Sequence, residues 1–178
     1  LLNYTILSSE RDGFDHYVKV NDLRRILTKN IIELDYQDED SIGNDPIKAN
    51  AVWVGGDYLN VSFHFNYGGE RPHLINLVGN KTSTEVKNGI IELELRHNSF
   101  NSQAERLYEG FICFDLKPLR LNHADSVKLS VKVKEWSEQT DNNTKETIYD
   151  VVYRYNRSNN VEATTEMPIP VITSNEYY

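Results

Sequence analysis

The chain has 178 residues, of which 39% are hydrophobic and 26% charged, and its formal net charge is −8. This length predicts one domain of generous size or two small ones, and no apolar run approaches the roughly 20 residues that a membrane-spanning helix needs. The excess of 27 acidic over 19 basic residues argues against a nucleic-acid-binding face, because such a face must neutralise phosphates.

The residue types favour strands over helices. The chain contains 14 Val, 13 Ile, 10 Thr and 11 Tyr, against 5 Ala. β-Branched and aromatic residues suit a pleated, half-buried surface, whereas alanine is the best helix former. The 19 Asn residues are turn formers. We therefore expect an all-β fold whose strands are joined by polar turns.

The N-terminal quarter of the chain predicts a hairpin and a connector. Residues 2–9 and 14–20 are β-rich and are separated by a turn that ends in Asp12-Gly13, a hairpin signal. The second run either continues through Leu23 and Ile26 or breaks at a short turn. Residues 35–46 are acidic and end in Gly43 and Pro46, which indicates a connector with at most one helical turn. We place the main domain boundary there.

From Ile47 onward the sequence predicts a β-sandwich domain over residues 46–156. Residues 57–67, 89–97 and 126–136 alternate apolar and polar side chains, which is typical of strands buried on one face. Residues 110–116 are apolar on both faces, as in a central strand. With residues 50–54, 73–78 and 145–155 these make seven strands of an antiparallel sandwich or barrel, packed around Phe63, Leu93, Phe114 and Val131. Residues 157–178 are predicted to be a polar tail.

Metal-binding patterns are weak in this sequence. His64 and His73 flank the turn at residues 66–69 and could meet across a hairpin, but a zinc site needs more ligands than two imidazoles. His97 continues the inward face of its strand and is interpreted as a hydrogen-bonded core residue. The acids of residues 35–45 do not have the spacing of a calcium-binding loop. We predict no metal and no cofactor.

Catalytic patterns are weak as well. A single cysteine, Cys113, excludes a disulfide within the chain, and it lies in the most apolar strand, where a thiol packs as a small hydrophobe. No serine lies in a G-x-S-x-G turn, and nothing in the sequence pairs two carboxylates. We therefore predict no catalytic residues and a protein that is not an enzyme.

Exposed aromatic residues are the best binding candidates. Trp53, Tyr58, Trp136 and Tyr149 lie on different predicted strands, where a ring can stack on a sugar or on a partner's side chain. The alternative is that these rings pack in the core or on a sheet face. Lysines 128, 132 and 134 indicate a solvated sheet face, paired across strands to Glu92 and Glu94.

Several stretches together resemble one family. They are HYVKVNDLRRILTKNIIEL (16–34), DSIGNDPI (40–47), WVGGDYLNVSFHFN (53–66), HLINLV (73–78), LELRHN (93–98) and GFICFDLKPL (110–119). The chain is similar over these stretches to the NigD-like proteins, small lipoproteins of the Bacteroidetes cell envelope. The WVGG…YLN and GNDP pieces are the most specific.

The resemblance implies an N-terminal OB-like domain followed by a C-terminal β-sandwich that resembles the immunoglobulin fold. Residues 1–34 would be the closing strands of the OB-like part, which with the connector gives a first unit of residues 1–45. The signal peptide and the lipidated cysteine would then lie upstream of Leu1. The implied location is extracytoplasmic, in the periplasm or on the outer membrane or cell surface, with the membrane reached only through that anchor. Ser41 and Ser126 lie in Asp-Ser-apolar triplets that resemble O-glycosylation sites of exported proteins in that phylum; otherwise they are ordinary connector and turn residues.

Three functions remain open from the sequence. We favour a non-catalytic envelope protein that binds a protein or a glycan through sheet edges or loop ends, with a bacteriocin-associated accessory role suggested by the family name. The second function is an OB-type binder of oligosaccharide or nucleic acid, although the net charge of −8 speaks against nucleic acid. The third is a hydrolase, for which His64, His73 and a carboxylate would have to surround one ion.

Overall fold

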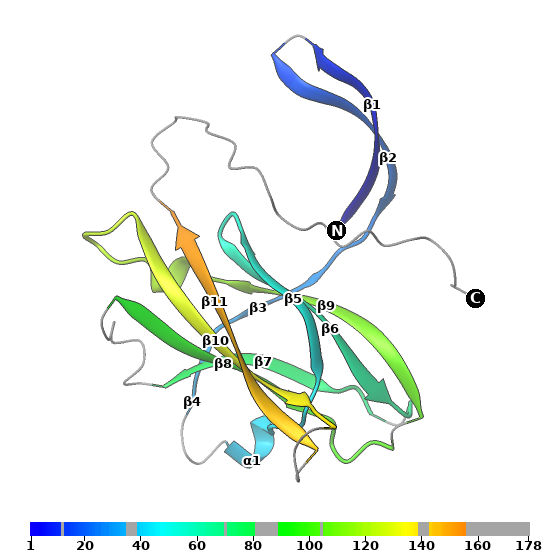
Figure 1. The fold of residues 1–178 in the computed structure, drawn as a ribbon, viewed down its shortest axis with the longest axis vertical. Coiled ribbons are helices and arrows are strands. Elements are labelled where there is room, and N and C mark those ends of the chain that lie inside the picture. Colours follow the sequence, from blue (N-terminus) through cyan, green and yellow to red (C-terminus); the bar gives the residue numbers. More distant parts are fainter. Residues whose placement is uncertain are drawn as a thin grey trace.

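The computed structural model describes residues 1–11, 13–34, 39–69, 71–80, 89–103, 105–138 and 143–155. These residues form an all-β structure with two packed sheets and a separate hairpin (Figure 1). The predicted polar tail, residues 157–178, lies outside the described residues. In the described ranges, no helix is long and apolar enough to cross a membrane.

The two sheets of the sandwich contain four and five strands. The four-stranded sheet holds, in spatial order, β3 (Leu27–Asn30), β9 (Arg106–Asp115), β6 (Tyr58–Tyr67) and β5 (Lys48–Gly55). The five-stranded sheet holds β11 (Thr144–Arg154), β10 (Ser126–Trp136), β8 (Ile90–Asn98), β7 (Leu74–Asn80) and β4 (Ile32–Leu34).

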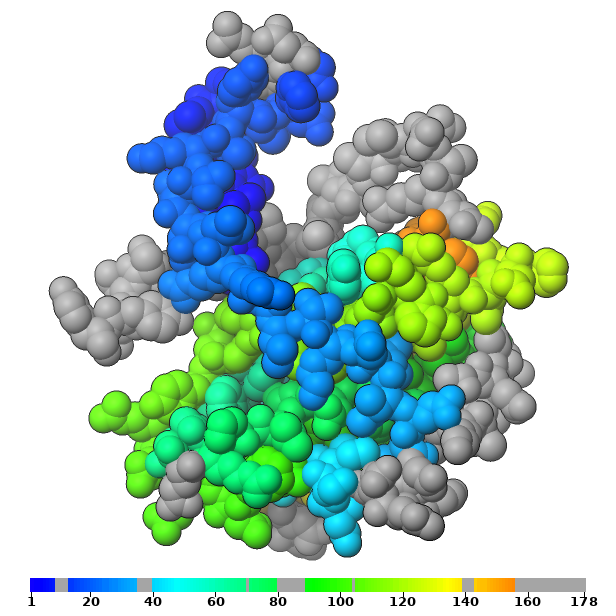
Figure 2. Space-filling view, turned by 180° about the vertical axis from the view of Figure 1, so that it is seen from behind, coloured from blue at the N-terminus to red at the C-terminus, as the bar shows by residue number. Residues whose placement is uncertain are grey.

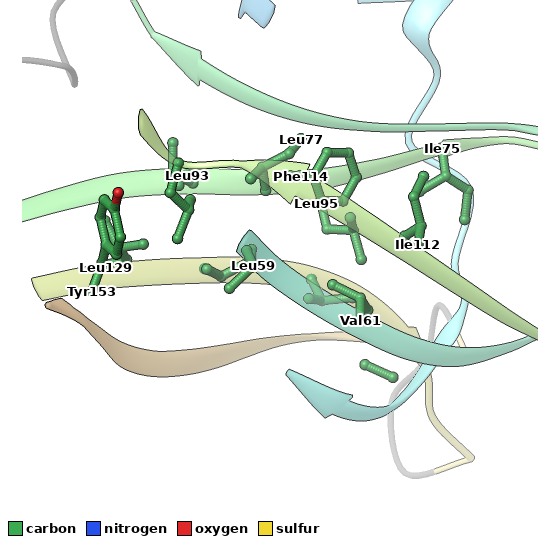
Figure 3. Close-up of a cluster of buried hydrophobic side chains, with 14 of the residues drawn as sticks. Leu59, Val61, Ile75, Leu77, Leu93, Leu95, Ile112, Phe114, Leu129 and Tyr153 are labelled. Atoms are coloured by element: carbon green, nitrogen blue, oxygen red, sulfur yellow. The ribbon is translucent and has the colours of Figure 1, made fainter. Parts of the chain in front are cut away.

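The hydrophobic core fills the space between these two sheets, as the alternating pattern predicted. One side chain in two along β6, β8 and β10 points inward, because successive side chains of a strand point to opposite faces. The four residues predicted to centre the core are at most 5% exposed: Phe63, Leu93, Phe114 and Val131. Figure 3 shows leucine, valine and phenylalanine side chains from both sheets meeting in this layer.

Three strand pairs are parallel, so the sandwich is mixed rather than wholly antiparallel as predicted. They are β8 with β10, β3 with β9, and β4 with β7. Strands β8 and β10 run the same way because the intervening β9 lies in the other sheet. Apolar alternation is the same in parallel and antiparallel strands, so it could not predict this pairing.

The predicted boundary at residues 45 and 46 does not follow the strand pairing. Strands β3 and β4 precede that boundary, yet β3 pairs with β9 in one sheet and β4 pairs with β7 in the other. A single residue, Ile31, separates the two strands where the chain passes from sheet to sheet. Residues 27–34 therefore belong to the sandwich, and an OB-like origin remains a prediction for the residues before them.

The N-terminal hairpin projects from the sandwich. Strands β1 (Leu2–Arg11) and β2 (Phe14–Leu23) pair with each other, and Gly13 turns between them with a φ of +84°. Figures 1 and 2 show this ribbon extending away from the two sheets. Its cross-strand neighbours Tyr4, Ile6, Val18 and Val20 are 40–54% exposed.

The acidic connector contains the predicted helical turn, α1 (Glu39–Ile42). Gly43 ends this turn with a φ of +72°, a left-handed conformation that glycine adopts without strain. A Cβ atom at Gly43 would lie 2.7 Å from Cβ of Asn98 and 2.9 Å from the carbonyl oxygen of His97. The turn is therefore held against the end of β8 by a residue that must be glycine for two reasons.

Candidate functional site

The outer face of the five-stranded sheet is covered with paired charges. Lys132 on β10 contacts Glu94 on the parallel β8 at 2.7 Å and Glu146 on β11 at 3.5 Å. Arg96 also contacts Glu94, at 2.7 Å. The hydrogen bond from Lys132 and the charges around Glu94 keep the pKa of this carboxyl below its usual value, although its burial alone would raise it. The predicted pairing of the lysine stripe with Glu94 is confirmed for Lys132.

The outer face of the four-stranded sheet has a different character. A row of side chains crosses all four strands in register: Trp53 on β5, Asn60 on β6, Cys113 on β9 and Thr28 on β3. These positions share a face because paired residues in adjacent strands point the same way. Tyr58 lies two residues before Asn60 on β6, so it points to the same face, and it is 37% exposed.

A hollow of about 370 Å³ lies over this row. Trp53, Tyr58 and Phe111 supply its aromatic wall, and Asn60, Thr28 and Cys113 supply its polar groups. The remaining lining comes from Val61, Ile112, Ile26 and Leu1. The structure thus brings two of the four predicted binding aromatics, Trp53 and Tyr58, to one concave place.

Asn60 organises the floor of the hollow. Its amide nitrogen donates to the carbonyl oxygens of Tyr58 and Trp53 over 3.3 and 3.5 Å, and its amide oxygen accepts the Cys113 thiol at 3.0 Å. Gly55 leaves room for this amide, since a Cβ atom there would lie 3.0 Å from Nδ2 of Asn60. Burial raises the pKa of Cys113, so the thiol stays protonated and acts as a hydrogen-bond donor rather than as a nucleophile.

Several polar side chains lie on the same outer face beyond the hollow. The ring nitrogen Nδ1 of His64 lies 2.9 Å from the amide oxygen of Asn50. The hydroxyl group of the buried Ser62 donates to Glu109 over 3.4 Å and accepts from Asn50 over 3.4 Å. The face therefore runs from an aromatic end to an end of amide, imidazole, hydroxyl and carboxylate groups.

The other two predicted aromatics lie elsewhere. Trp136, half-buried at the end of β10, donates its backbone N–H to the carbonyl oxygen of Ile47 over 3.3 Å. Tyr149 points inward from β11, and its hydroxyl group donates to Glu135 at 3.0 Å. Burial, followed by the bond to Glu135, raises the pKa of Tyr149 to about 12. Tyr149 is therefore engaged in a structural contact and is not presented at the hollow.

Glu135 is a buried carboxylate that the sequence analysis missed. Its side chain is 1% exposed, and it accepts hydrogen bonds from Thr147 at 2.6 Å, Tyr149 at 3.0 Å and the backbone N–H of Ala49 at 3.0 Å. Ala49 is on β5, so Glu135 ties the two sheets together. These bonds hold the pKa of Glu135 low, against a burial effect that would raise it. The alternation along β10 could have identified it, because Glu135 is the next inward-facing position after Val133.

The buried His97 and the partly buried His73 form a pair that differs from the predicted one. His97 is 3% exposed, as expected for a core residue, and its Nε2 lies 3.0 Å from Nδ1 of His73 on the neighbouring strand segment. His64 is on the outer face with Asn50 instead, so the expected meeting of His64 and His73 does not occur. Burial and then the neighbouring His73 lower the pKa of His97 to about 4. In the part of the chain that the structure describes, no three His, Cys, Asp or Glu side chains are placed to hold a metal ion.

The acidic connector and the predicted modification sites have ordinary surroundings. The Asp45 carboxylate accepts the backbone N–H and the hydroxyl group of Ser99 at 2.8 and 2.6 Å. Asp35 and Asp38 lie outside the described residues. Ser41 is exposed in α1 and Ser126 is exposed at the start of β10. Glycosylation of either serine remains a prediction.

The fold and this face define a class: a two-sheet β-sandwich with an open hollow lined by aromatic and amide side chains on one outer face. A family model for the NigD-like C-terminal beta sandwich domain matches residues 30–144. The chain belongs to the NigD-like family. The predicted resemblance is confirmed, and the matched range begins at the end of β3, in agreement with the strand pairing.

Solved structures of similar proteins come from Bacteroides and Parabacteroides species. A protein of unknown function from Bacteroides vulgatus has 29% identity and a TM-score of 0.66, with 89% of this chain and 71% of that chain covered. A protein of Parabacteroides distasonis, described as toxin related, has 30% identity and a TM-score of 0.67, with 87% and 72% covered. A NigD-like immunity protein from Bacteroides caccae shares the fold at 19% identity, with a TM-score of 0.64 and 82% and 69% covered. No curated protein matches the sequence significantly.

Proposed function

We propose that this NigD-like chain is a non-catalytic protein of the cell envelope that binds another macromolecule with the outer face of its four-stranded sheet. The observation that carries the proposal is the contrast between the two outer faces. One face is covered by the ion pairs around Lys132 and Glu94. The other leaves Trp53, Tyr58 and Asn60 around an open hollow. This replaces the sheet edges and loop ends expected from the sequence as the binding region.

Two further features support a binding role over a catalytic one. The Cys113 thiol is held protonated and donates to Asn60. Glu135 and Tyr149, a carboxylate and a phenol with shifted pKa values, are turned into the core as a contact between the sheets. These titratable groups thus serve packing, and we place the function on the face that carries the hollow.

An accessory role toward a bacteriocin is a second candidate. It is supported by two of the similar structures, one described as an immunity protein and the other as toxin related. The same sheet face would then hold a protein. An extracytoplasmic location, with an N-terminal lipid anchor, belongs to this proposal and comes from the family resemblance.

The experiment is a capture from envelope extracts of a Bacteroides species with the immobilised full chain. We expect a reproducible set of bound components that the double variant Trp53→Ala/Tyr58→Ala loses and the control variant Ile148→Ala keeps. Ile148 is 62% exposed on the opposite sheet, so this control removes exposed apolar surface outside the proposed face. An empty capture, or one that all three proteins give equally, would contradict the proposed function.

A further inference from the structure

We propose that the hollow over Trp53, Asn60 and Thr28 binds a sugar ring of a neutral oligosaccharide. This inference rests on the proposed function and specifies its ligand. The first argument is size. The hollow measures about 370 Å³, which falls among the roughly 300–1,000 Å³ of small-ligand sites. A protein partner instead requires about 800 Å² of surface on each side. A hollow of this size fits one sugar ring of an oligosaccharide, whose other rings would extend along the sheet.

The second argument is the charge of the lining. No side chain of the lining is charged; the polar groups of these side chains are the Tyr58 hydroxyl, the Trp53 indole, the Asn60 amide, the Thr28 hydroxyl and the Cys113 thiol. The ammonium group of Leu1 donates to the carbonyl oxygen of Arg24 at 2.7 Å. Lys117, whose Nζ lies 5.7 Å from the centre of the Tyr58 ring, is paired with Asp115 at 3.5 Å, and Arg120 is paired with Asp57 at 2.6 Å. A phosphate or carboxylate ligand would find no cationic side chain in this lining. A hydroxyl-rich neutral ligand would find both donors and acceptors.

The third argument is the arrangement of aromatic and amide groups. Trp53 and Tyr58 present flat apolar surfaces with a polar edge, which suit the apolar face and the hydroxyl rim of a pyranose ring. The Asn60 amide is already oriented by Cys113, Trp53 and Tyr58. Its nitrogen contacts, at 3.3 and 3.5 Å, are longer than the usual 2.9–3.0 Å, so they are easily exchanged for a ligand hydroxyl. The site is therefore positioned before a ligand arrives.

The stretch Trp53–Asn60 builds both the turn and the site. Gly56, with a φ of +59°, lets the chain reverse between β5 and β6, and Asp57 anchors the turn through Tyr153 and Arg120 at 2.8 and 2.6 Å. This anchoring holds Trp53 and Tyr58 on either side of the same turn. The most specific piece of the sequence is thus the piece that lines the hollow.

The experiment is an affinity measurement by isothermal titration with defined probes. Cellotetraose, mannotetraose, xylotetraose and chitotetraose are neutral probes, and tetragalacturonate is the anionic one. We expect the full chain to bind at least one neutral probe and to prefer it to the anionic probe. Trp53→Ala and Tyr58→Ala should each weaken this binding about tenfold or more, and the control Trp136→Ala should keep it within about twofold. Circular dichroism melts confirm that each variant is folded.

A subtler variant tests the geometry without removing a ring. Gly55→Ala places its Cβ 3.0 Å from Nδ2 of Asn60, so the amide must move while the sheet remains. We expect weaker binding of the same probe with an unchanged melting temperature. Unchanged binding in Gly55→Ala would exclude the Asn60 amide from the contact, and binding that persists in both ring variants would overturn the site.

The outcomes separate this inference from the proposed function. If no neutral probe binds but the envelope capture gives a protein that depends on Trp53 and Tyr58, the sugar inference is overturned and the binding face stands. If the anionic probe binds best, the argument from charge is overturned. If neither probes nor extract components bind, both proposals fall.

Discussion

At the scale of single residues, buried polar side chains hold the two sheets together. Glu135 reaches from β10 to Ala49 on β5. At another place Lys29 on β3 donates to the carbonyl oxygen of Ile75 over 2.8 Å and to the side chain of Asn76 on β7. Burial lowers the pKa of Lys29. A buried charge is costly unless it is fully hydrogen-bonded, so these contacts constrain how the sheets pack.

Removing Glu135 should therefore destabilise the sandwich strongly. In Glu135→Ala the N–H of Ala49 and the hydroxyl group of Thr147 lose their acceptor, and the hydroxyl group of Tyr149 keeps only the carbonyl oxygen of Ala49 at 3.3 Å. We expect a loss of about 3 kcal/mol in the free energy of unfolding, measured by urea denaturation at pH 7. The control Glu146→Ala removes an exposed carboxylate 3.5 Å from Lys132 and should cost less than about 1 kcal/mol. Equal effects of the two variants would contradict this role.

The buried histidine pair predicts a pH dependence. The pKa of His97 is about 4 in the folded protein, against an ordinary value of 6.5. Between these values the unfolded chain binds the proton and the folded one does not, so stability falls as the pH drops from 6.5 toward 4. The full loss from this group is about 3 kcal/mol.

Urea unfolding of His97→Gln from pH 4 to 7.5 checks this expectation. The variant should lose the part of the pH dependence that this imidazole causes and keep the part due to His73, Asp45 and Glu135. The comparison at pH 7.5, where His97 is neutral in both states, gives the packing cost of the substitution alone. An unchanged slope between pH 4 and 6.5 would show that His97 titrates normally.

At the scale of elements, the contact of β9 with β6 requires a glycine. A Cβ atom on Gly110 would lie 2.5 Å from Cζ of Phe63, its cross-strand neighbour. The ring of Phe63 thus occupies the place of a side chain on β9. Overpacking of this kind costs about 1–3 kcal/mol.

We expect Gly110→Ala to lower the free energy of unfolding by that amount and Phe63→Leu to relieve it. In a double-mutant cycle the combined variant should be more stable than the sum of the two single effects predicts, because the smaller side chain makes room for the methyl group. Additive effects, measured by urea unfolding of all four proteins, would contradict the contact.

The N-terminal hairpin is an element with its own behaviour. Strands β1 and β2 pair with each other, whereas β8 is paired on both sides by β7 and β10. Amides of the hairpin should therefore exchange through local opening, with a free energy several kcal/mol below the global value that β8 amides report. Native-state hydrogen exchange measures both. Equal opening free energies would show that the hairpin folds as one unit with the sandwich.

Sequence patterns predicted the elements better than their partners. Alternation along residues 57–67 and 89–97 identified the strands and their inward faces, because burial of one face leaves a period of two. It could not show that β8 and β10 are parallel neighbours, nor that β3 and β4 join different sheets, because pairing is a non-local property. The same limit applied to the site: Trp53 and Tyr58 were named with Trp136 and Tyr149, and only the fold separates the two pairs.

At the scale of the whole molecule, the two outer faces of one sandwich have different functions in this account. The outer face of the five-stranded sheet carries ion pairs and faces solvent. The outer face of the four-stranded sheet carries the hollow. An acidic chain of net charge −8 resists non-specific contact with other acidic surfaces. Recognition then depends on the neutral aromatic and amide groups rather than on the overall charge.

The most direct test of this account is site-specific photo-crosslinking in a Bacteroides host. A benzophenone amino acid replaces either Leu107, exposed on the outer face of the four-stranded sheet outside the hollow, or Ile148, exposed on the opposite sheet. The account predicts a discrete cross-linked product from position 107 that the additional change Trp53→Ala removes, and no comparable product from position 148. Cross-linking from position 148 alone, or from both positions without dependence on Trp53, would show that the four-stranded sheet does not carry the binding site.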